Sequence, residues 1–280
     1  ILRPDTTYFN LFPSLFVTYK ISPAHKLRFS YSRRIFRPYY SDLNPFLFYD
    51  DPYTITRGNP FLSPQYSNSF ELTYILFQAV NISASYSYTN DLISDISFQD
   101  GRTITNTKEN INRQDNLNFN FSAPTEITDW WGGYLWVGVY ANLFDDKVGG
   151  EELSFNQWGL NSFLSQTFQV DDWSLEISGF FNSRSRSIIF ENGANGGVNV
   201  SVGKRLLKGK GFVKVGVTDV FKTNQFERNA DFGNVRFNSL DTFESRGLSV
   251  SMSYNFGNSK VKRSRERETA SSSEQDRIGK

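Results

Sequence analysis

A strict alternation of apolar and polar side chains recurs along almost the whole chain and limits what it can fold into. The clearest case is segment 80–89, VNISASYSYT, in which every second residue is apolar or aromatic and the others are Asn, Ser or Thr. A period of two places the apolar side chains on one face of a β-strand and the polar ones on the other. Similar segments follow one another, so we predict an all-β chain of about eleven strands without a helix of appreciable length.

The stretch from 26 to 77 contains the unit that the rest of the chain repeats. Alternating strands are predicted at both of its ends, and they are joined by the long loop 37–66. This loop holds Gly58 and five prolines. Proline lacks a backbone N–H and fixes its own φ, so a continuous helix or a central strand is excluded there. We therefore predict an antiparallel hairpin with a long loop.

The connections between the predicted strands alternate between short and long. The short ones are 22–25, 78–79, 123–126, 170–172 and 206–211, and the segments 145–150, 191–197 and 224–244 are predicted to be loops. Short turns on one side and long loops on the other are typical of outer-membrane barrels. The chain has no run of about 18 apolar residues, which excludes a transmembrane helix. We predict an antiparallel transmembrane β-barrel that contacts outer-membrane lipid, with Trp130, Trp131 and Tyr134 at one membrane–water boundary.

The direction of the strands adds a second expectation about the barrel. If the short turns are periplasmic, the first and last predicted strands run the same way, and the number of strands is odd. Bacterial single-chain barrels have an even number of antiparallel strands. An odd set leaves two open edges, which lipid does not tolerate. We therefore expect further strands before residue 1 to complete the barrel.

Composition excludes several classes of function. The chain has no cysteine and one histidine (His25), which rules out disulfides and thiolate or histidine metal clusters. Its net charge of +1 argues against a broad basic surface for nucleic acid. The acidic pairs at 50–51, 145–146 and 171–172 lack the spacing of a calcium loop and are read as turn residues. His25 lies in a short turn, on the side opposite the long loops, which argues against a Ser-His catalytic site there. We predict no cofactor, no metal site and no enzymatic activity.

The last segment of the chain differs sharply from the rest. Residues 258–280 contain no aromatic side chain and mix basic, acidic and serine residues. We predict that residues 1–257 form the barrel part and that residues 258–280 form a disordered periplasmic tail. The basic run 260–267 is interpreted as a solvated linker, with contact to anionic lipid head groups or to a periplasmic partner as the alternative.

The loop 37–66 carries the candidate ligand-binding residues. Tyrosine rings stack on ligands and arginines form hydrogen bonds with them, so this loop is a candidate to bind a sugar, peptide or siderophore at the extracellular mouth. The alternative is that the aromatic rings and prolines only pack the loop over the barrel rim. The six candidates are Arg37, Tyr39, Tyr40, Tyr49, Tyr53 and Arg57.

Four segments of this chain resemble a known family of outer-membrane proteins. They are YSRRIFRPYYSDLNPF (31–46), DPYTITRGNPFLSPQYSNSFELTY (51–74), KVGVTDVFKTN (214–224) and SYNFGNSK (253–260). The chain resembles the Bacteroidetes-type outer-membrane β-barrel family, whose members are similar to TonB-dependent receptors. The resemblance implies the C-terminal half of a barrel of about twenty-two strands.

The resemblance also implies a function and partners. Proteins of this kind take up a scarce nutrient, here a siderophore, glycan or peptide, and draw energy from TonB through an N-terminal plug that these residues do not contain. A surface lipoprotein is a further possible partner at the mouth. Two alternatives stay open. One is a structural or assembly subunit of an outer-membrane complex, and the other is a secreted carbohydrate-binding β-sandwich.

Overall fold

The computed structural model describes residues 9–148, 151–233 and 235–256, and most of these belong to β-strands. No helix in this part of the chain is long and apolar enough to cross a membrane. The elements are β1 Ser14–Lys20, β2 His25–Phe36, α1 Tyr40–Leu43, β3 Phe48–Asp51, β4 Thr54–Thr56, β5 Gln65–Leu76, β6 Val80–Asp100, β7 Thr103–Pro124, β8 Trp131–Val148, β9 Glu151–Val170, β10 Trp173–Asn182, β11 Ser185–Ser187, β12 Phe190–Asn192, β13 Asn195–Leu206, β14 Gly211–Thr218, β15 Phe226–Phe232, β16 Val235–Asp241 and β17 Gly247–Tyr254.

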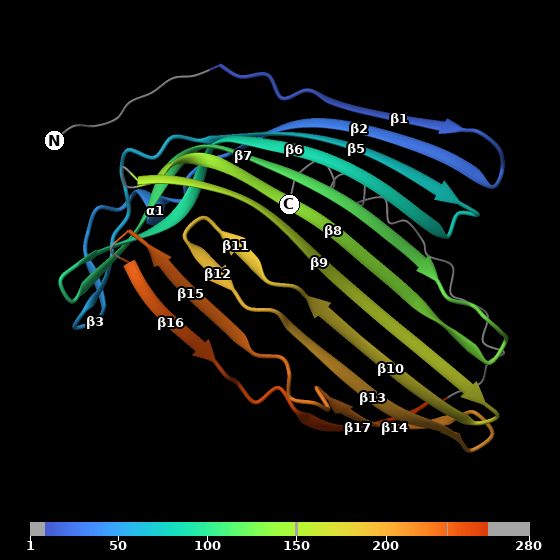
Figure 1. Ribbon diagram of the computed structural model, residues 1–280. Coiled ribbons are helices and arrows are strands. Elements are labelled where there is room, and N and C mark those ends of the chain that lie inside the picture. The colour runs from blue at the N-terminus through green and yellow to red at the C-terminus, as the bar shows by residue number, and fades with distance from the viewer. Residues whose placement is uncertain (1–8, 149–150, 234, 257–280) are drawn as a thin grey trace, which may run out of the picture.

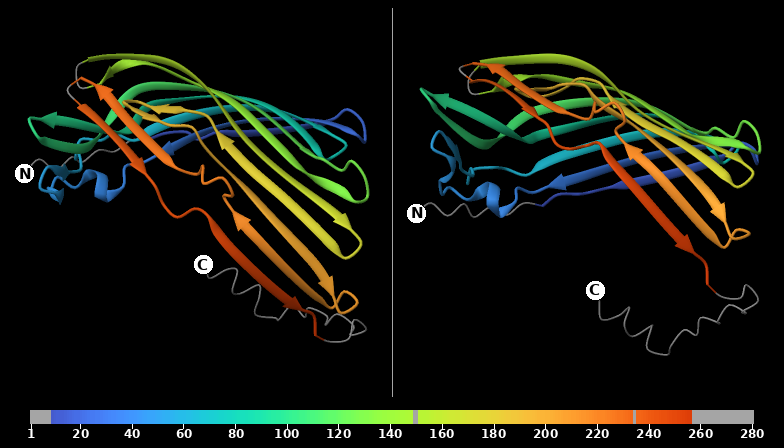
Figure 2. Two further views of the ribbon diagram at one scale, coloured as in Figure 1. Left: turned by 60° about the horizontal axis from the view of Figure 1, so that its bottom comes forward. Right: turned by 90° about the horizontal axis from the view of Figure 1, so that it is seen from below.

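Eleven of these strands form one antiparallel path, which we call the wall, in the order β1-β2-β5-β6-β7-β8-β9-β10-β13-β14-β17. They are the strands that the alternation predicts, so the prediction of an all-β, antiparallel architecture is confirmed. The strands lie side by side in Figure 1, and Figure 2 shows that the sheet curls into an open arch. Within the described residues, β1 and β17 each pair on one side only, which leaves both edges of the arch open.

One face of this sheet, which we call the apolar face, carries rows of apolar and aromatic side chains. In one row the pairing register joins Leu27 to Tyr74, Tyr74 to Ile82, Ile82 to Phe121 and Phe121 to Val137. Directly paired residues share a face of an antiparallel sheet. Ile82 remains 49% exposed. Such a continuous exposed apolar surface is stable against lipid hydrocarbon rather than against water.

The opposite face, which we call the polar face, carries serine and asparagine in register. One row runs Ser32, Ser69, Ser87, Asn116 and Asn142 across five strands. The Asn116 amide donates a hydrogen bond to the Asn142 side-chain oxygen at 2.7 Å. Short polar side chains of this kind suit a hydrated interior, as expected for the lumen side of a barrel.

Aromatic rings bound the apolar face near both of its ends. Near the short turns, Trp131 stacks on Phe168, with ring centroids 5.4 Å apart. Trp158 lies on the same face of β9, ten positions before Phe168. Ten residues span about 34 Å along a strand, which becomes about 26 Å when the strand tilts by about 40°. This matches the apolar thickness that a barrel presents to an outer membrane.

The predicted aromatic cluster is only partly assembled. Trp130 and Trp131 lie together, with ring centroids 6.1 Å apart, and Trp130 also contacts Phe168. Tyr134 instead pairs with Ser165 and Pro124, three positions from Trp131 and therefore on the polar face. Their position at a membrane boundary stays a prediction.

Several segments predicted as loops are strands. The sequence predicts a loop over 145–150, but β8 continues to Val148 and β9 begins at Glu151. The segment 224–244 forms the hairpin of β15 and β16, and β12 and β13 extend into the Asn/Gly-rich segment 191–197. These predictions were wrong because both faces of these strands are rich in polar residues, so the alternation that marks a wall strand is missing.

The main apolar core lies at the end with the long connections, not in the wall. There β11, β12, β15 and β16 form a separate four-stranded sheet, visible beside the far ends of β8 and β9 in Figure 1. Its residues Ile188, Phe190 and Val235 pack with Ile96 of β6 and Phe144 of β8 in one buried cluster. The wall strands thus extend beyond membrane thickness and form a local sandwich with this sheet.

The two faces predict opposite responses to a charge on β17. Val250, paired with Val215, is on the apolar face, and Ser251, paired with Lys214, is on the polar face. Val250→Arg should cost roughly 2–4 kcal/mol at mid-membrane depth and reduce assembly, whereas Ser251→Arg should assemble normally. Heat-modifiable mobility on SDS gels of membrane fractions measures this. Equal assembly of both variants would contradict the assignment of the two faces.

Candidate ligand-binding site

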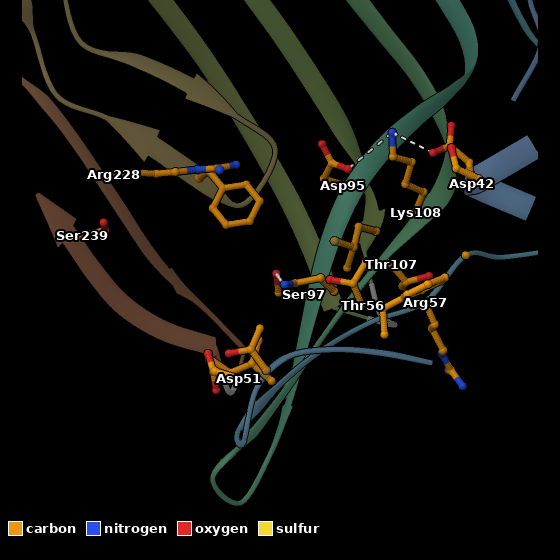
Figure 3. A pocket seen from close by; sticks show the side chains of 18 residues that line it. Asp42, Asp51, Thr56, Arg57, Asp95, Ser97, Thr107, Lys108, Arg228 and Ser239 are labelled. Atoms are coloured by element: carbon orange, nitrogen blue, oxygen red, sulfur yellow. Dashed lines mark hydrogen bonds and ion pairs between the residues drawn. The ribbon is translucent and has the colours of Figure 1, made fainter. Parts of the chain in front are cut away.

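A cavity of about 900 Å³ opens at the end of the molecule with the long connections. Its walls come from the loop 37–66, from the far ends of β6 and β7, and from the four-stranded sheet (Figure 3). This volume is in the range of ligand-binding pockets. The lining residues are Ser41, Asp42, Phe48, Asp51, Thr54, Thr56, Arg57, Gly58, Asp95, Ile96, Ser97, Ile104, Asn106, Thr107, Lys108, Phe190, Arg228 and Ser239.

The loop 37–66 is anchored to the sheet by main-chain pairing. Its strand β4 lies parallel to β7, with Thr54 opposite Ile104 and Thr56 opposite Asn106. The Arg57 N–H donates to the Asn106 carbonyl at 3.0 Å. β7 has no β8 partner along this stretch, because its pairing with β8 extends only to Gln114. β4 therefore covers an edge that would otherwise be unpaired.

Side chains tie the rest of the loop to the same strand. The Asn59 amide donates to the Lys108 carbonyl at 3.1 Å, and Ser63 and Asn110 exchange hydrogen bonds of 2.7 and 2.9 Å. Gly58 packs directly on the backbone of α1, where an added Cβ would lie 2.5 Å from the Asp42 carbonyl oxygen. Only glycine fits this contact, so the loop is a folded, attached structure.

Lys108 connects the loop to the hairpin of β6 and β7. Its ammonium group lies 3.3 Å from a carboxylate oxygen of Asp42 in the loop and 3.7 Å from one of Asp95 on β6. Figure 3 shows Lys108 between the two acids. The Asp42 side chain is only 11% exposed. The positive charge of Lys108 is thus balanced by carboxylates within the wall of the cavity.

Three charged residues of the lining, Asp51, Arg57 and Arg228, form no ion pair within the described residues. The Asp51 carboxylate accepts hydrogen bonds from the Thr54 side chain and from the Tyr53 N–H, and these hold the pKa of Asp51 below its usual value. Asp51 is therefore ionised near neutral pH. On the opposite wall the Arg228 guanidinium lies over the Phe190 ring, 3.7 Å from its centroid.

The structure separates the six predicted residues. Arg57 lines the cavity, although its guanidinium points away from Arg228 and Ser97 in Figure 3. Tyr39 packs edge-on against Phe36 at 5.4 Å, as the packing interpretation expects. The others, Arg37, Tyr40, Tyr49 and Tyr53, are exposed on the loop, outside the lining of this cavity. Their role in ligand binding stays a prediction.

Sequence reasoning missed most of the polar residues that line the cavity. The sequence predicts only barrel strands for the segments that carry Asp95, Ser97, Asn106 and Lys108. A signal was available, because a hairpin that turns at Gly101 places Asp95 opposite Lys108, as observed. Arg228 had no such local signal, because its strand β15 lacks the alternation of apolar and polar residues that marks a barrel strand.

Asp219 fixes the start of the connection that leads to the four-stranded sheet. Its buried carboxylate accepts hydrogen bonds from the Ser245 hydroxyl at 2.5 Å and from the Thr223 and Asn224 N–H groups at 3.0 and 3.1 Å. Its own N–H donates to the Asn199 side chain at 3.0 Å. These donors, above all the Ser245 hydroxyl, lower the pKa of Asp219.

The comparison with protein families identifies the wall that carries this cavity. The model of the outer membrane protein beta-barrel family matches residues 3–254. The chain belongs to this family. The predictions of an outer-membrane location and of a barrel fold are thereby confirmed, and the Bacteroidetes-type subdivision stays a prediction. A search of curated proteins found no match.

This outer-membrane β-barrel chain is also similar in fold to solved receptors and transporters. A variant of the ferric enterobactin receptor from Pseudomonas aeruginosa, in complex with enterobactin, aligns with a TM-score of 0.57 and 18% identity over 88% of this chain and 41% of the receptor. A siderophore receptor from the same organism aligns with a TM-score of 0.62 and 14% identity over 88% of this chain and 42% of the receptor. A copper transporter aligns with a TM-score of 0.59 and 11% identity over 87% of this chain and 39% of the transporter. The chain thus spans about two fifths of these proteins.

The Lys108 contacts predict how firmly the loop is held. Lys108→Met leaves Asp42 without its cation and should weaken attachment of the loop by about 1 kcal/mol, which exposes the segment 37–66 to protease. Limited proteolysis followed by mass spectrometry measures the cleavage rate in this segment. The control is Lys210→Met in an exposed short turn, and equal cleavage of the two variants would contradict the role of Lys108.

The hydrogen bonds of Asp219 predict a dependence on pH. Because the pKa of Asp219 is lower in the folded protein, its stabilising effect is complete above the unfolded value of about 3.9 and is lost as the pH falls through the folded value. Cleavage of the segment 219–246 by an acid-active protease should therefore rise on acidification below about pH 4. In Asp219→Asn it should be fast at both acidic and neutral pH. A wild-type acid response in this variant would refute the prediction.

Proposed function

We propose that this chain forms part of the wall and the extracellular ligand-binding end of an outer-membrane receptor for uptake of a scarce nutrient. The observation that carries the proposal is the cavity of about 900 Å³ where the long connections meet the far ends of β6 and β7. A site at this position takes a ligand from outside and lies above the hydrated interior. The role proposed is binding and passage without enzymatic chemistry.

The fold comparisons support this proposal. The similar structures include receptors for siderophores and a copper transporter. We extend to this chain the uptake function that their names describe, with a siderophore, glycan or peptide as the class of nutrient. Energy would come from TonB through a plug belonging to the same protein. A surface lipoprotein over the mouth stays a prediction.

The open edges of the sheet are part of the same proposal. The backbone groups on the unpaired sides of β1 and β17 have no partner within the described residues. In lipid such groups must be hydrogen-bonded, so a working barrel requires further strands between these edges. A total of about twenty-two strands, as in large outer-membrane transporters, is the arrangement we propose.

A structural or assembly role is the second candidate, and one observation favours it. The loop 37–66 presents large exposed side chains, among them Tyr40 at 95%, Phe61 at 75% and Phe46 at 73% exposure. Exposed aromatic residues are typical of protein–protein contact surfaces. A secreted β-sandwich is not supported, because the wall is one curved layer and the family is one of outer-membrane barrels.

Blocking the cavity distinguishes uptake from a structural role. Ser239→Trp places a large ring in the cavity, and Ser187→Trp adds the same ring at an exposed position outside its lining. In a strain that lacks the gene, wild type and Ser187→Trp should restore growth on a limiting nutrient, whereas Ser239→Trp should not. Immunoblots of outer membranes check that the amounts are equal. Full restoration by Ser239→Trp would favour the structural role.

A further inference from the structure

On the side of the four-stranded sheet that faces the core, the side chains change from apolar to polar over two residues of β15. Phe190 is paired with Ala230, and both are buried in the apolar cluster. Two residues earlier on β15, and therefore on the same face, lies Arg228, paired with Asn192 and Ser239. A strand that continued the core would carry an apolar residue at this position. Here the core gives way to the cavity, and an arginine lines it.

The arginine is held in place while its hydrogen-bonding edges stay available. The Phe190 ring covers one face of the guanidinium at 3.7 Å, a cation–π contact that limits its movement. Within the described part of the chain, no hydrogen bond or ion pair to a protein group engages the Arg228 side chain. Lys108, by contrast, is neutralised by Asp42 and Asp95. Arg57 also lines the cavity, but its guanidinium points away from Arg228 and Ser97 (Figure 3), so Arg228 is the cation that this wall of the cavity offers to a ligand.

The chemistry of the guanidinium indicates what it recognises. Its planar N–H donors match the two oxygens of a carboxylate or phosphate, and such charge-assisted pairs are stronger than neutral hydrogen bonds. Phe48, Ile96 and Ile104 also line the cavity, so part of the ligand lies against apolar side chains. A neutral sugar would leave the arginine without a counter-charge.

We propose that the cavity binds a ligand with an anionic oxygen group, carboxylate or phosphate, and that Arg228 receives this group. This inference rests on the proposed function, since it names the chemical class of the nutrient. Among the siderophore, glycan and peptide classes, it selects members that carry an acidic group. Asp51, ionised on the opposite wall, then faces the uncharged or cationic part of the ligand.

Calorimetry with simple probes tests the proposal. Purified full-length protein in detergent is titrated at constant ionic strength with citrate, with inorganic phosphate and with sucrose. Citrate or phosphate should bind, and sucrose should not. The anion that binds with the higher affinity shows whether the site prefers a carboxylate or a phosphate. Arg228→Gln should lower the affinity for that anion by at least about tenfold. Arg228→Lys should also weaken it, because lysine lacks the planar fork.

A matched control and a folding check complete this test. Arg102→Gln removes the same charge at the exposed β6–β7 turn, outside the lining, and should bind like wild type. Heat-modifiable mobility shows that each variant is folded. Anion binding by Arg228→Gln equal to wild type, or sucrose binding as tight as citrate, would overturn the proposal. If anion binding depends on Arg228 but Ser239→Trp still restores growth, the ligand site stands and the uptake function fails.

Discussion

The structure depends on cross-strand pairing that holds every residue of the wall in one register. Because side chains alternate along each strand, a slip by one residue would move all apolar side chains from the lipid side to the polar side. The rows from Leu27 to Val137 and from Ser32 to Asn142 show that the register is kept across successive strands. The same pairing carries β6 to β9 beyond the membrane thickness, where they support the cavity.

Alternation made the wall predictable from the sequence. Each wall strand sits between two different solvents, so its pattern is visible within a single segment, and all eleven strands of the main path could be located. The four-stranded sheet has no such local mark. Its key pair, Phe190 with Ala230, joins two different connections, and short strands rich in Asn, Arg and Asp resemble turns. Pairing between distant loops is decided by tertiary packing, which one sequence does not display.

The same distinction explains the result for the candidate site. The aromatic loop 37–66 was recognised by its composition, and it does form one wall of the cavity. Composition does not tell which side of a loop faces a cavity, however, and of the six predicted residues Arg57 alone is in the lining. Predicting Asp95 and Lys108 as site residues would have required following the β6–β7 pairing register beyond the membrane-spanning part of the strands. Predicting Arg228 would have required the four-stranded sheet, which has no local pattern in the sequence.

The charged residues around the cavity divide between holding the loop in place and remaining available to a ligand. The loop is fixed by β4, by Gly58 against α1 and by Lys108, so its shape exists before a ligand arrives and little ordering entropy is lost on binding. Lys108 is already neutralised and therefore serves attachment of the loop. Arg228 is held by a ring and not by an acid, so its charge is available to a ligand. The attachment of the loop and the recognition of the ligand thus use different cations, and each can change without loss of the other.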